Sequence, residues 1–327
     1  MPAKPSIHFA TVNMSILVTG SLAYDYIMDF PDSFKNHILP DQIHILSVSF
    51  VVPKMEKNWG GTAGNVAYNF KLLNSDPIIF SPLGRDAKDY LDYFQNLKIN
   101  TDYIPVSEQK LTASAHIITD KDDNQITAFY TGATDEATDL SIENVKSKID
   151  LALICATKKD AMIKHAKECY DQKIPFVFDP GQQITAFDAR ELSMLIGQAK
   201  FYIVNDYEMK LTQEKTGWDA NELLNHVEVL IITLGERGSI VRTKDQTWEI
   251  KPCPPTSVDD PTGAGDAYRA GFFTAYLNGY DFRVCGQAGS VSSVYAVEHY
   301  GTQNHSYTLE EFKQRYEETY DEKINFS

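Results

Sequence analysis

The sequence predicts an α/β protein in which a three-layer α/β/α body carries a small β-sheet lid. Its 327 residues are enough for a substantial core, as about two domains or as one large domain with an insertion. Short apolar segments alternate along the chain with longer segments of helical periodicity, which is typical of a parallel sheet covered by helices on both faces. Four other strand-like segments follow without helices between them, and these predict the lid.

The elements of the body follow from this alternation. Strands are expected at 15–19, 78–81, 151–155, 175–178, 201–204 and 229–234. Helices are expected between them at 64–73, 86–97, 158–171, 188–198, 206–215 and 220–226, and in the last third at 264–278, 281–298 and 308–320. Residues 1–13 are expected to be a disordered or over-called N-terminal extension, with Met14 as an alternative start.

The lid strands are predicted from alternation and from β-branched residues. They are expected at about 23–30, 43–52, 112–119 and 126–131, with a hairpin tip at Asp122-Asp123-Asn124. The lid is therefore built from two separated insertions. A sheet beside an α/β body can close over a site at the strand ends.

Composition excludes several classes of function. Lys and Arg number 30 and Asp and Glu 45, which gives a formal charge of −15. Such an acidic chain argues against nucleic acid or an anionic membrane surface as the partner. No stretch approaches the ~18 apolar residues of a membrane helix, and no signal peptide is recognisable. The four cysteines form no C-x-x-C pair, so we expect a reduced, cytoplasmic protein.

The segment from Asp260 to Phe272 is the strongest chemical signal. Gly263, Ala264 and Gly265 leave backbone N–H groups unobstructed at the start of a strong helix pattern, which makes an anion-binding site. Asp266 lies in the first turn of the same helix. An anion site beside a carboxylate suits phosphoryl transfer, in which the carboxylate takes a proton from the attacking hydroxyl. Taken alone, the same residues also fit an ordinary helix start whose Asp complements the macrodipole.

A second glycine-rich segment, Gly60-Gly61-Thr62-Ala63-Gly64-Asn65, also enters a helix. Its glycines allow close approach of the backbone to a ligand, and Asn65 can exchange hydrogen bonds with sugar hydroxyls. A tight strand-to-helix connection is the alternative interpretation. The chain contains neither the P-loop motif nor a well-formed Rossmann fingerprint.

Together the two segments resemble the paired signatures of the PfkB/ribokinase family of carbohydrate and nucleoside kinases, over nearly the whole chain from Met14 onward. Further stretches resemble the bacterial adenosine kinase branch of that family. These are Val18-Thr19-Gly20-Ser21 with Asp25, Ser47-Val48-Ser49-Phe50, Asp179-Pro180-Gly181-Gln182-Gln183, Asn205-Asp206-Tyr207-Glu208 and Gly301-Thr302-Gln303.

The resemblance implies that residues 14–327 form a ribokinase-like kinase domain that converts ATP and adenosine into ADP and AMP, in purine salvage. By the same resemblance, Asp266 is the general base for the ribose 5′-hydroxyl, and the amides of 263–266 form the anion hole. Asp25 binds two ribose hydroxyls, helped by Gly61 and Asn65. The alternative for Asp25 is a residue that simply ends a strand.

The nucleotide site is implied in the same way. Asn205 and Glu208 match an N-x-x-E element that organises Mg²⁺ and phosphate through water, and Thr233, Gly235 and Gly238 match a T-x-G-x-x-G turn near ATP. Asp260 and Thr262 are candidates for a monovalent-cation site, with K⁺ as the ion. Glu208 could instead be a solvated helix residue, and the Thr233–Gly235 segment an ordinary strand-to-turn transition.

Recognition of the nucleobase is expected to depend on aromatic stacking. Phe129 is the candidate, with Phe50 the weaker one, and an exposed Phe on a lid strand also fits a homodimer through the lid. Ala115 and His116 occupy the stretch where the adenosine kinase branch has a second aromatic residue. Gln182 and Gln183 either line the nucleoside site or satisfy loop backbone.

Two alternatives to an adenosine kinase therefore stay open. One is a sugar kinase or a broad-specificity nucleoside kinase of the same family. The other is a non-catalytic nucleoside-binding sensor, against which the intact Asp266 argues, because a sensor has no use for a base.

Overall fold

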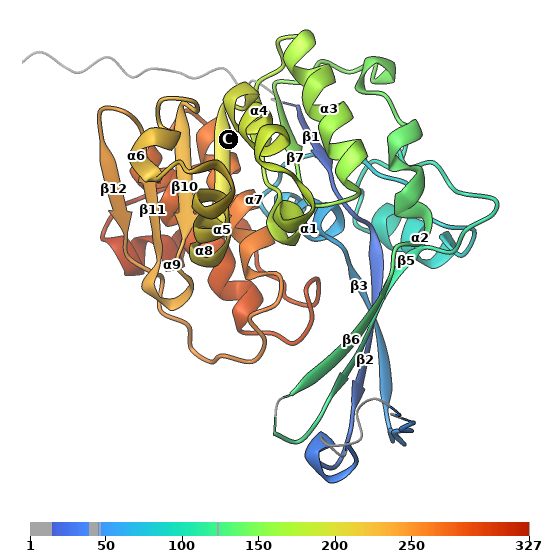
Figure 1. The fold of residues 1–327 in the computed structure, drawn as a ribbon. Helices are drawn as coiled ribbons and strands as arrows, with labels where there is room; N and C mark the ends of the chain where they lie inside the picture. Colours follow the sequence, from blue (N-terminus) through green and yellow to red (C-terminus); the bar gives the residue numbers. More distant parts are fainter. Residues whose placement is uncertain (1–14, 39–44, 46, 123, 327) are drawn as a thin grey trace, which may run out of the picture.

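A computed structural model describes residues 15–38, 45, 47–122 and 124–326, so the expected extension at 1–13 lies outside the described residues. The chain forms an α/β body from which a narrow, twisted sheet projects (Figure 1). The body sheet has eight strands in the order β12-β11-β10-β9-β8-β7-β1-β4, and the projecting sheet has four in the order β3-β2-β5-β6. This arrangement confirms the predicted α/β fold class.

The expected body strands and helices are all present, with ends shifted by at most three residues. The strands are β1 (Ile16–Thr19), β4 (Ile78–Phe80), β7 (Leu151–Ile154), β8 (Phe176–Phe178), β9 (Phe201–Asn205) and β10 (Val229–Thr233). The helices are α1 (Thr62–Leu72), α2 (Lys88–Asn96), α3 (Lys159–Asp171), α4 (Ala189–Gln198), α5 (Asp206–Thr216), α6 (Ala220–Leu223), α7 (Ala264–Leu277), α8 (Phe282–Val297) and α9 (Leu309–Tyr320). The sequence analysis missed β11 (Ser239–Arg242) and β12 (Thr247–Ile250), an antiparallel hairpin that extends the sheet beyond β10.

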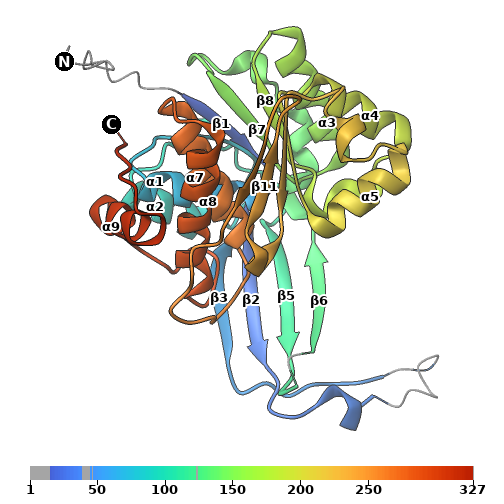
Figure 2. The same cartoon turned by 90° about the vertical axis from the view of Figure 1, so that its left-hand side faces the viewer.

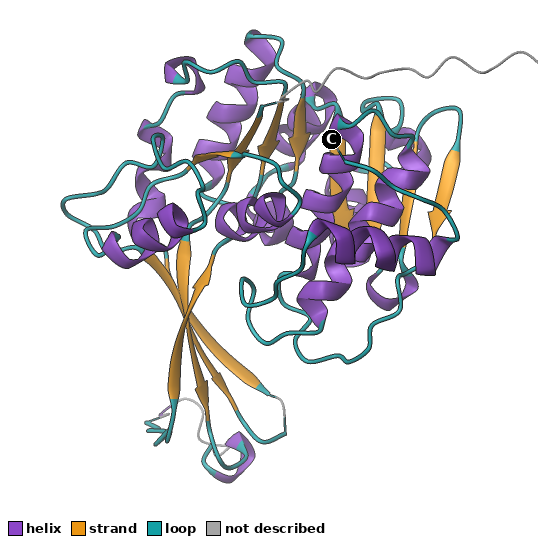
Figure 3. Cartoon of the chain, turned by 180° about the vertical axis from the view of Figure 1, so that it is seen from behind, coloured by secondary structure: helices purple, strands orange, loops and turns teal. Residues whose placement is uncertain are grey.

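Helices cover both faces of the body sheet. Helices α3, α4 and α5 lie on one face, and α1, α7, α8 and α9 lie on the other (Figure 2). Seen from behind, helices again lie in front of the body strands (Figure 3). Side chains of one strand alternate between the two cores: Ile16 and Val18 pack on the α7–α8 side, whereas Leu17 packs on the α3–α4 side. All three are at most 1% exposed, which explains why the strand reads as a continuous apolar run. No helix among the described residues is long and apolar enough to cross a membrane.

The lid consists of β2 (Ala23–Asp29), β3 (Met55–Gly60), β5 (Ala113–Thr119) and β6 (Gln125–Tyr130). The strand predicted at 43–52 was wrong, because its described residues, 45 and 47–52, form no strand. The third lid strand is instead the more polar β3, which pairs antiparallel with β2 and ends in the glycines that lead into α1. Within this segment Phe50 packs its ring 4.8 Å from that of Phe30 and 5.0 Å from that of Phe34, whereas Ile45 and Val51 are exposed. Phe50 therefore belongs to the lid tip.

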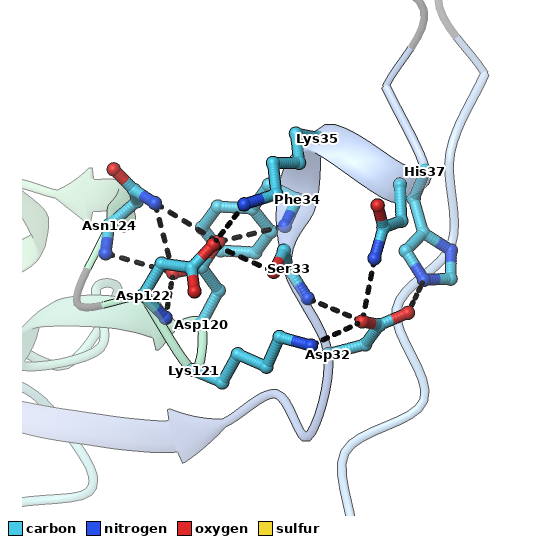
Figure 4. Close-up of polar contacts among 10 residues, drawn as sticks. Asp32, Ser33, Phe34, Lys35, His37, Asp120, Lys121, Asp122 and Asn124 are labelled. Atoms are coloured by element: carbon cyan, nitrogen blue, oxygen red, sulfur yellow. Dashed lines mark hydrogen bonds and ion pairs between the residues drawn. The ribbon is translucent and has the colours of Figure 1, made fainter.

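Polar contacts fasten the tip of the lid (Figure 4). The Asp120 carboxylate accepts hydrogen bonds from the Phe34 amide at 2.8 Å and the Asn124 amide at 2.9 Å. Ser33 Oγ and Lys35 Nζ donate to Asp122 Oδ2 at 2.7 and 2.8 Å. Because these bonds join the segment after β2 to the β5–β6 hairpin, the two insertions form one unit.

Candidate active site

Helix α7 begins at the carboxyl edge of the body sheet with Gly263 as its N-cap. Gly263 has φ +82°, and a Cβ atom there would lie 3.1 Å from Thr302 Cβ, so both its backbone conformation and its close contact favour glycine. The amides of Gly265 and Asp266 lie in the first helical turn, where N–H groups have no partner within the helix, whereas the Ala264 amide donates to the Pro261 carbonyl oxygen at 3.3 Å. This geometry supports the predicted anion hole.

Asp266 projects beside these amides and is partly buried. Asn65, on α1, donates from Nδ2 to Asp266 Oδ2 at 2.8 Å. Burial raises the pKa of Asp266 to about 6, although the Arg269 guanidinium and the Asn65 hydrogen bond oppose this shift. A carboxylate with this pKa is ionised at neutral pH and is more basic than an ordinary Asp, which suits a general base.

Asp25, on lid strand β2, faces the same space as Asp266. Burial raises the pKa of Asp25 to about 6, and the negative charges of Asp266 and Asp260 add to the shift. A Cβ atom on Gly60 would collide with the Asp25 carboxylate, so the first glycine of the Gly60-Gly61 pair leaves room for this group. The structure thus brings together two carboxylates that lie 241 positions apart in the sequence, 266 − 25 = 241.

Asp25 belongs to a row of residues that crosses the lid. It pairs with Asn58 on β3 and with Ala115 on β5, and Ala115 pairs with Phe129 on β6. Residues that pair directly share one face of a sheet. Phe129 therefore lies on the same face as Asp25, with the small Ala115 between them. Its ring is 56% exposed, so it is open to a ligand or to a second subunit; the homodimer through the lid stays a prediction.

The candidate nucleotide residues meet at the ends of two neighbouring strands. Thr233, the last residue of β10, pairs with Asn205, the last residue of β9. Gly235 and Gly238 have positive φ, and a Cβ atom on Gly238 would collide with the Ile250 carbonyl oxygen. This turn lies at the carboxyl edge of the sheet, where open α/β sheets bind ligands.

Asn205 and Glu208 also have a structural task, because they form the capping box of α5. Asn205 Oδ1 accepts from the Glu208 amide, and Glu208 Oε2 accepts from the Asn205 amide, both at 2.8 Å. Glu208 is buried rather than solvated, and this burial raises the pKa of its carboxyl. Its second oxygen leaves capacity for a water-mediated contact, so the predicted role in Mg²⁺ binding stays a prediction.

The remaining predicted residues lie around this edge. Gly61 caps α1 with φ +86°, and a Cβ atom there would lie 2.5 Å from the Ser21 carbonyl oxygen. Asp260 accepts from the amides of Thr262 at 2.9 Å and Gly301 at 3.1 Å, so its carboxylate shapes the loop before α7. Gln182 and Gln183 lie in the short 3₁₀ segment Gly181–Ala186 after β8, where Thr185 donates to the Gln182 carbonyl oxygen.

One buried ion pair beside the site was missed by the sequence analysis, although both of its residues lie in the segments it quoted. Arg269, on α7, makes a two-pronged ion pair with Asp179, at the end of β8; their side chains are 11% and 4% exposed. Burial alone would lower the pKa of Arg269, but the Asp179 carboxylate raises it. The available signal was a charged residue inside the apolar stretch Ala267–Phe273.

A partly buried carboxylate beside a helix N-terminus, at the carboxyl edge of a mainly parallel sheet, is an arrangement that suits phosphoryl transfer. The family model "pfkB family carbohydrate kinase" matches residues 17–309. The chain therefore belongs to this family of kinases. This result confirms the family that the sequence resembles.

Its relatives include nucleoside kinases. A nucleoside kinase of Methanocaldococcus jannaschii is 34% identical over 304 residues, covering 92% of this chain and 96% of the relative. The Burkholderia thailandensis nucleoside kinase, solved with inosine, is 37% identical with a TM-score of 0.86, and the match covers 94% of this chain and 99% of that one. The same enzyme solved with ADP-inosine gives 39% identity and a TM-score of 0.84, covering 95% of this chain and 98% of that one.

Proposed function

We propose that this kinase transfers the γ-phosphoryl group of ATP to the ribose 5′-hydroxyl of a nucleoside, with adenosine as its acceptor and AMP as the product. The observation that carries this proposal is the row from Asp25 through Ala115 to Phe129, which begins beside Asp266. Strands lie about 4.8 Å apart, so the ends of the row are about 10 Å apart. That span would suit a nucleoside, with Asp25 accepting from sugar hydroxyls at one end and Phe129 stacking on the base at the other.

The reaction follows from the positions of the two carboxylates. Asp25 holds the sugar by accepting hydrogen bonds from two hydroxyl groups. Asp266 removes the proton of the attacking hydroxyl as its oxygen bonds to the γ-phosphorus and the bond to the ADP oxygen breaks. The amides at the start of α7 stabilise the charge on the transferring phosphoryl group. Lid closure excludes water and so prevents hydrolysis of ATP.

Mg²⁺ fits this site if it arrives with the nucleotide. Within the described part of the chain, no group of three or more His, Cys, Asp or Glu side chains could hold a metal ion. A metal bound mainly by phosphate oxygens and water needs no such cluster, and Glu208 would hold one of those waters. The ion would neutralise phosphate charge. We place K⁺, if it is used, at the loop of Asp260 and Thr262.

A panel of acceptors tests the proposal. ADP release from ATP and Mg²⁺ is measured with adenosine, guanosine, inosine, cytidine, ribose and fructose. We expect turnover with nucleosides rather than with bare sugars, because a bare sugar leaves Phe129 without a partner. If adenosine is the acceptor, it gives the highest kcat/KM. Highest turnover with ribose or fructose would support the sugar-kinase alternative, and even turnover across the nucleosides would support broad specificity. Absence of ADP release with every acceptor would support the sensor.

Replacing Asp25 tests the sugar end of the row. We expect Asp25→Ala to weaken acceptor binding by about 2–4 kcal/mol, because two charge-assisted hydrogen bonds are lost. Calorimetry with the acceptor measures this directly, and ATP binding serves as the internal control. Unchanged acceptor affinity would remove Asp25 from the site.

A further inference from the structure

A chain of buried side chains leads from the base of the lid to Asp266. The Tyr90 hydroxyl donates to the Gly60 carbonyl oxygen at 2.7 Å, and Gln303 Nε2 donates to the Tyr90 oxygen at 3.1 Å. Gln303 Nε2 also donates to Asn65 Oδ1 at 2.9 Å, and Asn65 Nδ2 donates to Asp266 Oδ2 at 2.8 Å. Tyr90, Gln303 and Asn65 are at most 5% exposed, so water does not compete strongly for these bonds.

The direction of the chain is set at its far end. The Gly60 carbonyl can only accept, so the Tyr90 hydroxyl must donate to it and its oxygen accepts from Gln303. Only the amino group of Gln303 can make that bond, so the same group also faces Asn65. Asn65 must then present its carbonyl to Gln303 and its amino group to Asp266. Thus a backbone carbonyl determines, through three side chains, which atom meets the catalytic carboxylate.

The opposite orientation is compatible only with a protonated Asp266. If both amides were reversed, the Asn65 carbonyl would face Asp266 Oδ2, which is repulsive unless that oxygen carries a proton. The Gly60 carbonyl would also lose its donor. The observed orientation therefore favours the ionised form, which is the form that can accept a proton.

Two glycine-containing segments are shaped around this chain. A Cβ atom on Gly64 would collide with the Tyr90 hydroxyl and would lie 3.1 Å from Gln303 Nε2, so glycine at this position leaves room for the bonds. The residues before Gln303 are anchored on both sides: Thr302 Oγ1 donates to the Trp59 carbonyl at 3.0 Å, and the Gly301 amide donates to Asp260. Gln303 is thus held between lid strand β3 and the loop before α7.

We propose that Gln303 is a positioning residue for phosphoryl transfer. It holds the Asn65 amide so that its amino group donates to Asp266 Oδ2, which leaves Oδ1 for the proton of the acceptor hydroxyl. The inference rests on the proposed role of Asp266 as the base. The charged or titratable groups around Asp266 are Asp25 on β2, Cys155 and Asp179 after β7 and β8, and Arg269 on α7.

The test compares two substitutions of similar size at Gln303. A carboxylate can only accept, so Gln303→Glu would draw the Asn65 amino group away and turn its carbonyl toward Asp266. We expect kcat at pH 7.5 to fall about tenfold to a hundredfold and the acid limb of the kcat profile to move to higher pH, with a smaller change in acceptor KM. Gln303→Met removes the bonds but leaves Asn65 able to donate, so its loss is expected to be smaller and without that pH shift.

Controls separate positioning from packing and from failure of the proposed function. Gln246→Glu makes the same change in the exposed β11–β12 turn and is expected to leave the pH profile unchanged. Tyr90→Phe removes the hydroxyl that fixes the orientation of the Gln303 amide, so the Gln303 carbonyl can then face Asn65. It should shift the acid limb in the same direction as Gln303→Glu, and it also serves if Gln303→Glu fails to fold. An unshifted limb in the Glu and Phe variants overturns the role of Gln303. Normal turnover of Asp266→Asn, measured alongside, overturns the base itself.

Discussion

Asp266→Asn is expected to bind the acceptor and ATP normally and to lose about 10²–10⁴-fold in kcat. The substitution keeps the size of the side chain and still offers Asn65 an acceptor oxygen in place of Asp266 Oδ2, at the position where the present bond is 2.8 Å. It removes only the ability to take a proton. Binding energy and the anion hole at the start of α7 are retained, so the loss should fall on kcat and not on KM.

The measurement combines ADP release with calorimetry of the acceptor. Thermal unfolding provides the folding control, and the direction in which the unfolding temperature changes is informative. Because burial raises the pKa of Asp266 to about 6, its ionised form costs stability above that pH. Asp266→Asn should therefore unfold at a higher temperature than the unaltered chain near pH 7.5, and the difference should shrink as pH falls through about 6. Near-normal turnover in a variant that behaves in this way would reject Asp266 as the base.

The pH dependence of the unaltered enzyme follows from the same carboxyl. A base must be deprotonated to act, so kcat/KM should fall as pH decreases through about 6. Asp25 has a raised pKa of about 6 as well, so its protonation weakens sugar binding in the same range. Profiles of kcat and of acceptor affinity against pH distinguish the two groups: in Asp25→Ala the acid limb of kcat should persist. An activity that stays constant down to pH 4.5 would contradict both assignments.

The catalytic segments could be predicted from sequence because each carries its constraint locally. A Gly-Ala-Gly-Asp helix start and continuous apolar strands such as β1 are recognisable from neighbouring residues alone. Strand β3 could not be recognised in this way. It forms because it pairs with β2, and it ends in glycine because the Asp25 carboxylate lies close to Gly60; both contacts involve residues distant in the sequence. The 43–52 segment misled because apolar residues do not by themselves make a strand: Phe50 packs in a cluster at the lid tip, whereas Ile45 and Val51 are exposed.

The same distinction applies to the site. Asp266 and Asp25 are expected from motifs, but the contacts that set their properties cross 90 to more than 200 positions, as in the Arg269–Asp179 and Asn65–Gln303 pairs. The periodicity of apolar residues does not indicate which distant residues form such pairs. A buried charged or amide side chain requires a partner, so Arg269 within an apolar helix indicated that a counter-charge exists without indicating where it lies.

The ion pair between Arg269 and Asp179 gives the second large expected effect, which is on stability. Arg269→Met is expected to lower the free energy of unfolding by about 3–5 kcal/mol, because Asp179 is left as an uncompensated buried charge. Removing both charges, in Arg269→Met with Asp179→Leu, should recover most of the loss. Urea denaturation of the three proteins measures the difference.

Arg283→Met is the matched control, because Arg283 also makes a two-pronged pair, with Glu322 at 2.7 and 2.9 Å, but the two side chains are 40% and 43% exposed. An exposed pair contributes about 1 kcal/mol or less. Both pairs are two-pronged, through Nε and Nη2 in Arg269 and through Nη1 and Nη2 in Arg283, so burial is the main difference between them. Equal losses in Arg269→Met and Arg283→Met would mean that burial adds nothing at the Asp179 site. A larger loss at Arg269, relieved by the double substitution, would show that the loss in Arg269→Met comes from leaving Asp179 as an unpaired buried charge.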